Sequence, residues 1–167
     1  TLDTEGVGAA YGALLAEECA AFGFNMDFAP SLDIWSNPDN TVIGDRAFGN
    51  DWEWTAFFGM SAVESMEEQG GVIPVVKHFP GHGDTSVDSH VALPVVDKSL
   101  EELWQSELVP FNMVLNQEDY FGAQSGPSAP AVMVDHILFS QVDPDYPPTL
   151  SHRVVTGLLR EELGFDG

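Results

Sequence analysis

The chain has 167 residues, and its 27 aspartates and glutamates against five lysines and arginines give a formal net charge of −22. Its length suffices for one domain with a core, and a hydrophobic fraction of 44% excludes a disordered segment. The negative charge repels nucleic acids and anionic membrane surfaces, and no apolar run is long enough to span a membrane. We therefore expect neither nucleic acid nor membrane as a partner. The single cysteine, Cys19, excludes an internal disulfide, and we expect it to be buried in a helix.

Helices and strands alternate along the first half of the chain. Apolar residues spaced near 3.6 predict a helix over residues 6–23, and a short strand over 24–30 follows. Residues 31–51 are rich in Asn, Asp, Gly and Pro and indicate a long loop. A second helix is expected over 52–69, closed by two glycines, and the apolar run 72–79 is typical of a strand covered on both faces.

The second half repeats this alternation. A long loop is expected over 80–97, and a helix over 99–117 that opens with a Ser99–Glu102 capping box and is bent or interrupted by Pro110. A third buried strand is expected over 131–139 and a last helix over 151–163, capped by Ser151.

This order predicts right-handed β/α units around a parallel sheet. Three strands alone would leave two bare edges, and a closed eightfold barrel needs about 250 residues. We therefore expect an α/β fold that is part of a TIM-like (β/α)8 barrel, with its early and late strands missing. A small, open, doubly wound domain is the alternative.

The residues suited to chemistry concentrate between positions 77 and 90. Lys77 and His78 lie where a buried strand ends, which is the edge at which parallel β/α folds bind ligands. Asp88 precedes His90 by two residues in a glycine-rich loop. A carboxylate at that spacing can orient one imidazole nitrogen and leave the other for general acid/base work.

Other interpretations of these residues stay open. His78, His82, Asp88 and His90 together have the residue types of a zinc site, although a Pro-Gly turn separates the first two. Lys77 could simply pair with a neighbouring carboxylate. Arg46 is the one cation of the loop 31–51; it could bind substrate hydroxyls or a carboxylate, or form an ion pair within its loop.

Four segments of the chain resemble a known family in their residues and in their order along the chain: FNMDFAPSLDI, NPDNTVIGDRAFG, VVKHFPGHGDTSVDSH and TGLLREELGFDG. They are similar to the catalytic barrel of family 3 glycoside hydrolases. The KHFPGHG segment followed by DSH resembles the β-N-acetylhexosaminidase (β-N-acetylglucosaminidase) branch of that family. The resemblance covers essentially the whole chain and implies one partial catalytic domain over residues 1–167.

The resemblance also implies a reaction. It is the hydrolysis of terminal, non-reducing β-linked N-acetylglucosamine with retention of configuration, on a small amino-sugar glycoside and without a metal or other cofactor. His90 would be the acid/base residue and Asp88 would orient it, while Arg46, Lys77 and His78 would bind the sugar hydroxyls. The family's nucleophile lies on the strand after GFDG, where this chain ends, so we expect the 167 residues alone to be inactive. A metal-dependent hydrolase and a non-catalytic sugar-binding module are the alternatives.

Overall fold

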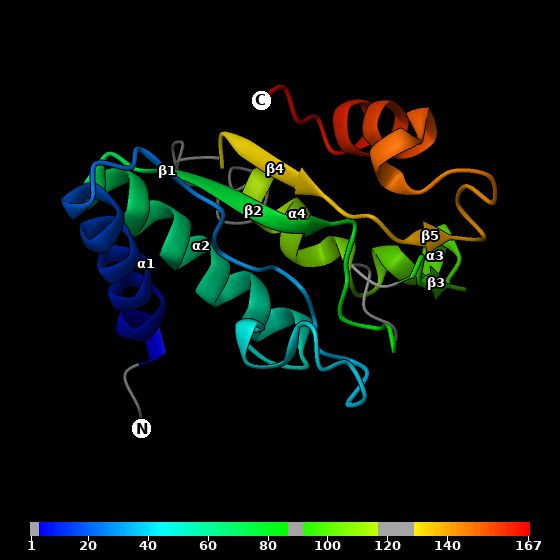
Figure 1. Cartoon of the computed structure of the whole chain (residues 1–167), viewed down its shortest axis with the longest axis horizontal. Helices are drawn as coiled ribbons and strands as arrows, with labels where there is room; N and C mark the ends of the chain where they lie inside the picture. Colours follow the sequence, from blue (N-terminus) through cyan, green and yellow to red (C-terminus); the bar gives the residue numbers. More distant parts are fainter. Residues whose placement is uncertain (1–3, 87–91, 117–128) are drawn as a thin grey trace.

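The computed structural model describes residues 4–86, 92–116 and 129–167. Its main sheet consists of three parallel strands in the order β1-β2-β4: β1 (Met26–Asp27), β2 (Ile73–Phe79) and β4 (Ala131–Val134) (Figure 1). Two short strands, β3 (Val95–Val96) and β5 (Leu138–Phe139), form a second, parallel pair. The parallel arrangement confirms the prediction of β/α units.

Three helices form a row that follows the order of the strands. Helix α1 (Thr4–Ala21) packs on α2 (Trp52–Gly70), and α2 packs on α4 (Leu108–Leu115). Both α2 and α4 contact β2, and Figure 1 shows α1 and α2 side by side. Strands added in one direction, each with its helix in the same row, are the arrangement of a singly wound barrel and not of a doubly wound sheet.

The ends of α2 follow from its sequence. The Asp51 side chain accepts hydrogen bonds from the backbone N–H groups of Glu53 and Trp54, at 2.8 and 3.3 Å. Gly71 ends the helix in the left-handed conformation at φ 58°, which glycine adopts without steric cost. The predicted bounds, 52–69, are therefore confirmed to within one residue.

The expected helix over 99–117 is interrupted, but not at its proline. It begins with the predicted capping box and continues as α3 (Leu100–Trp104), and α4 starts after residues 105–107. Pro110 lies in the first turn of α4, where an absent backbone N–H breaks no intrahelical hydrogen bond. The expected bend at Pro110 is thus wrong, and the break precedes it.

The expected strand over 131–139 is also two elements. After β4 the chain leaves the main sheet, and residues 138–139 pair as β5 with β3, which lies far away in the sequence. The last helix, η3 (Arg153–Glu162), forms where it was predicted, with Ser151 Oγ accepting a hydrogen bond from the Val154 N–H. Two short 3-10 turns, η1 (Gly44–Arg46) and η2 (Pro148–Leu150), complete the structure.

The main core cluster includes residues of β2, α2, α4, the β3–β5 pair and η3, with Phe79, Phe111 and Phe139 among its largest buried side chains. Cys19 was expected to be buried but is only partly so; it packs beside a small cluster around Met66. None of the helices in the described ranges is both long and apolar enough to cross a membrane.

Candidate functional site

The site is organised around Asp33, which follows β1 and is fully buried. Its carboxylate accepts four hydrogen bonds. Oδ1 accepts from the backbone N–H groups of His82 (2.7 Å) and His78 (3.3 Å), while Oδ2 lies 2.7 Å from the Ser31 hydroxyl and 2.6 Å from His78 Nδ1. Burial alone would raise the pKa of Asp33, but these donors and the charge of His78 hold it below its ordinary value. Asp33 is therefore an anion that fixes two histidines.

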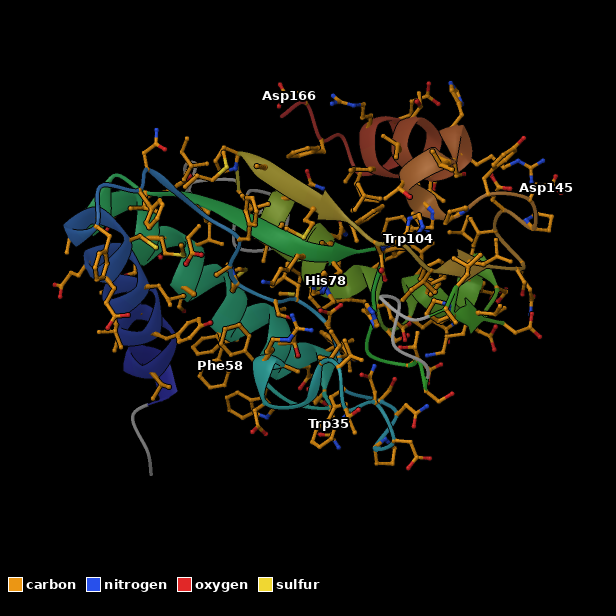
Figure 2. All side chains as sticks on the ribbon, in the orientation of Figure 1. Trp35, Phe58, His78, Trp104, Asp145 and Asp166 are labelled. Atoms are coloured by element: carbon orange, nitrogen blue, oxygen red, sulfur yellow. The ribbon has the colours of Figure 1, made fainter. Side chains whose placement is uncertain are left out.

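The backbone explains why His78 faces this carboxylate. In the pairing of β2 with β4, Lys77 is opposite Met133 and Phe79 is opposite Val134, so His78 has no partner residue on β4. The His78 backbone N–H donates a hydrogen bond to Asp33 Oδ1, and the imidazole Nδ1 forms a hydrogen bond with Oδ2 of the same carboxylate. Figure 2 shows His78 near the carboxyl end of β2. The sequence placed His78 at this edge correctly.

Lys77 and Arg46 meet in one pocket. The cavity of about 420 Å³ is lined by both residues together with Tyr11, Ser31 and Asp45. Burial and the positive charge of Arg46 lower the pKa of Lys77. The Arg46 guanidinium donates to the Val42 carbonyl from Nε (3.1 Å) and Nη2 (2.6 Å), which fixes the side chain while other N–H groups stay available to a ligand.

His82 is buried and belongs to a second hydrogen-bond network. Its Nδ1 lies 3.0 Å from Thr85 Oγ1, and its carbonyl accepts from Asn40 Nδ2 at 2.7 Å. Burial lowers the pKa of His82. Asn40 also accepts hydrogen bonds from the backbone N–H groups of Val42 and Ile43, so it joins the Arg46 loop to the turn that carries His82.

Asp135, at the end of β4, is a second buried carboxyl near this cluster. Its Oδ1 accepts from the His136 N–H at 2.6 Å, and among the described residues its Oδ2 has no hydrogen-bond partner. Burial, together with the negative charge of Asp33, raises the pKa of Asp135 to about 8. The ring of His136 contacts Thr149 Oγ1 at 2.7 Å.

The structure thus brings together three of the five residues singled out from the sequence. Arg46 and Lys77 share a pocket, and His78 adjoins it through the Ser31–Asp33 contact. Asp88 and His90 lie outside the described residues.

Asp33 and Asp135 were missed as members of the site. The chain has 27 acidic residues, and nothing in the sequence says which of them is buried. A serine two residues before an aspartate, at the end of a strand, was the only available signal for Asp33.

Within the described ranges, no group of three or more His, Cys, Asp or Glu residues could hold a metal ion, and the four-residue zinc site stays untested. Two of its four expected ligands, Asp88 and His90, are not described. The Nδ1 atoms of His78 and His82 are engaged with Asp33 and Thr85.

Comparison with known proteins gives matches over nearly the whole chain. Residues 3–167 match the model of the glycosyl hydrolase family 3 N terminal domain. A β-hexosaminidase of Pseudomonas aeruginosa is 40% identical over 93% of this chain and 43% of its own length. The chain therefore spans less than half the length of this curated relative.

Two solved structures are similar in fold as well as in sequence. A family 3 β-N-acetylglucosaminidase from Paenibacillus sp. str. FPU-7 superposes with a TM-score of 0.88 and 44% identity over 98% of this chain and 29% of its own. NagZ from Neisseria gonorrhoeae, in complex with N-trifluoroacetyl-D-glucosamine, superposes with a TM-score of 0.85 and is 34% identical in sequence. That match covers 98% of this chain and 44% of the NagZ chain. The prediction of a partial (β/α)8 barrel is confirmed, and the doubly wound alternative is wrong.

Proposed function

Since this chain belongs to family 3 of the glycosyl hydrolases, we propose that it is one partial catalytic domain, residues 1–167, of a β-N-acetylglucosaminidase. The proposed substrate is a small glycoside with a terminal, non-reducing β-linked N-acetylglucosamine. One observation carries the proposal. Arg46 and Lys77 line the same pocket at the carboxyl ends of β1 and β2, and Asp33 holds His78 beside it.

The proposed sugar site consists of Arg46, Lys77 and His78. Both cations are donors, so they suit hydroxyl oxygens, and a partly desolvated site strengthens each such hydrogen bond. The His78 side chain is 15% exposed, and its Nδ1 is held by Asp33. The ring nitrogen Nε2 is then the atom that faces a ligand, and its orientation is fixed before any sugar binds.

The proposed acid/base pair is Asp88 and His90, which we assign from their place in the family's motif. The imidazole of His90 would donate a proton to the leaving oxygen and then take one from the attacking water, while Asp88 orients the ring. Retention requires a second group on the other face of the anomeric carbon. We assign that nucleophile to a residue beyond Gly167, so the reaction needs the longer protein.

The test measures hydrolysis of 4-nitrophenyl N-acetyl-β-D-glucosaminide by the full-length protein that carries this chain and by residues 1–167 alone. We expect activity from the full-length protein only. NMR should show that the sugar product is first formed in the β configuration. His90→Ala should lower kcat/KM by about 100-fold or more. Lys77→Met should chiefly weaken binding of the sugar.

Two outcomes would overturn this function. A full-length protein that cleaves no N-acetylglucosaminide but binds N-acetylglucosamine in isothermal titration would be a sugar-binding module. If a chelator removed stoichiometric zinc and abolished activity at the same time, the protein would instead be a metal-dependent hydrolase.

Arg153→Met is a suitable control for the substitutions in the site. Arg153 is exposed, and among the described hydrogen bonds its side chain makes one, to the Val142 carbonyl.

A further inference from the structure

The loop after β1 carries a second cavity, which the proposed function does not use. It has a volume of about 490 Å³ and is lined by Trp35, Ser36, Pro38, Gly49 and Asn50. We call it the Trp35 cleft. Its described lining contains no charged side chain, whereas the pocket of the proposed sugar site contains two cations. Figure 2 labels Trp35 on this loop, below His78 in that view.

The indole of Trp35 is partly exposed and is held in one orientation. Its Nε1 donates a hydrogen bond to the Asn40 carbonyl at 3.0 Å, and the Trp35 backbone N–H donates to the Gly49 carbonyl at 2.9 Å. Asn40 is buried and fixed in turn, since its side-chain amide donates to the His82 carbonyl at 2.7 Å. Because Nε1 is already engaged, the indole offers a ligand its apolar surface. A ring held in place beforehand loses little entropy when a ligand binds.

Two polar side chains line the Trp35 cleft beside the indole. Asn50 is exposed, and its amide can both donate and accept hydrogen bonds. Ser36 Oγ donates to Asp84 Oδ1 at 3.3 Å, so the hydroxyl oxygen keeps lone pairs that can accept from a ligand. One aromatic surface together with a few polar groups is the usual composition of a site for a small ligand.

The composition of the Trp35 cleft favours a neutral sugar ring. An anionic ligand would find no lysine or arginine in the described lining, and a cationic ligand would find no carboxylate there. The C–H bonds on one face of a β-linked N-acetylglucosamine ring form an apolar surface, and the electron-rich face of an indole attracts their positively polarised hydrogens. Hydroxyl and acetamide groups at the edge of the same ring suit the Ser36 hydroxyl and the Asn50 amide.

The Trp35 cleft and the pocket of the proposed sugar site share two backbone segments. Phe48 lines the pocket, and the next residue, Gly49, lines the cleft. Ser31 lines the pocket and Trp35 the cleft, and the chain between them can span at most about 14 Å. We propose that the Trp35 cleft binds one neutral pyranose ring of an N-acetylglucosamine oligosaccharide, stacked on the indole of Trp35. This inference rests on the proposed function for its choice of sugar.

The test is isothermal titration of the full-length protein with N,N′,N″-triacetylchitotriose. The protein carries His90→Ala to keep the ligand intact, and chromatography checks that it does. We expect the further change Trp35→Ala to weaken binding of the trisaccharide by about 10-fold or more, and that of N-acetylglucosamine by less than about twofold. One trisaccharide per chain means that the cleft and the sugar site take the same molecule. Two per chain, one of them lost with Trp35→Ala, means that the cleft takes a separate glycan.

Two further variants separate stacking from a structural role of Trp35. Trp35→Phe deletes the hydrogen bond to Asn40 just as Trp35→Ala does, but it keeps an aromatic ring and should retain most of the affinity. Asn50→Ala changes an exposed side chain and should weaken trisaccharide binding a few-fold. Trp54→Ala is the control, because this exposed tryptophan does not line the cleft, and it should leave the affinity unchanged.

The outcomes for the Trp35 cleft and for the proposed function are distinct. Unchanged affinity and stoichiometry with Trp35→Ala, or an equal loss with Trp35→Phe, would overturn the sugar site in the cleft and leave the proposed function standing. A full-length protein without His90→Ala that hydrolyses no N-acetylglucosaminide, but binds the trisaccharide through Trp35, would overturn the proposed function and leave the cleft as a sugar site.

Discussion

Two buried aspartates flank the end of β2, and their surroundings shift their pKa values in opposite directions. Asp33 accepts four hydrogen bonds and has a lowered pKa. Asp135 accepts one from the His136 N–H, and its pKa is raised to about 8. Both are less than 4% exposed, so burial does not distinguish them. The number of donors that the fold aims at each carboxylate decides its charge, and only Asp33 is equipped to hold His78 as a partner.

Replacing Asp33 should have the largest effect on this comparison. Asp33→Asn puts an amide donor where the carboxylate accepted four hydrogen bonds, so two donors would face another donor. We expect a loss of about 3–5 kcal/mol in the free energy of unfolding. We expect kcat/KM to fall by about 100-fold or more because His78 loses its orientation. Urea denaturation and N-acetylglucosaminide hydrolysis, both measured on the full-length protein, report the two effects.

The effect of Asp33→Asn should depend on pH in one direction. A carboxyl with a lowered pKa in the folded state stabilises the protein above its ordinary pKa, and this stabilisation is lost as pH falls through the lowered value. The stability difference from wild type should therefore be constant near neutral pH and shrink below about pH 4. Asp39→Asn, in an exposed position of the same loop, is the control. Equal stability of the two variants would contradict the role of Asp33.

Replacing Asp135 should have an effect of the opposite sign that appears only as the pH rises. The folded protein holds the Asp135 proton up to a pH of about 8, the value of its raised pKa, whereas the unfolded chain releases it near 4. Ionisation thus costs the folded state increasingly as pH rises between these values. Asp135→Asn should match wild type at pH 4 and exceed its free energy of unfolding by an amount that grows by about 1.4 kcal/mol per pH unit up to a pH of about 8. Denaturation curves across this range measure it.

Asp145→Asn, at an exposed position, is the matched control. If Asp135→Asn destabilised the protein equally at every pH, Asp135 would be an ordinary ionised carboxylate with a partner. The contrast with Asp33 would then disappear.

The sequence predicts the features of the molecule that neighbouring residues determine, and it misses those that depend on contacts between distant segments. Local signals were sufficient for α2, where Asp51 and Gly71 mark the ends, and for the Ser99–Glu102 capping box. The strand-end rule was sufficient for Lys77 and His78. The split of residues 131–139 depends on pairing with Val95–Val96, and the break before α4 places Glu107 against Lys98. Contacts between distant segments determine both, and no local pattern records them.

The smallest effect is expected from removing one of the four donors to Asp33. Ser31→Ala deletes a 2.7 Å hydrogen bond but leaves His78 and His82 in place, so the carboxylate stays anionic. We expect a loss of about 1 kcal/mol in the free energy of unfolding and a fall in kcat/KM of roughly two- to fivefold. Ser140→Ala removes a comparable hydrogen bond, to Asp97 at an exposed position, and should cost less than about 0.5 kcal/mol. If Ser31→Ala cost as much as Asp33→Asn, the hydroxyl and not the set of four donors would control Asp33, since a single missing donor would then equal the loss of the whole carboxylate.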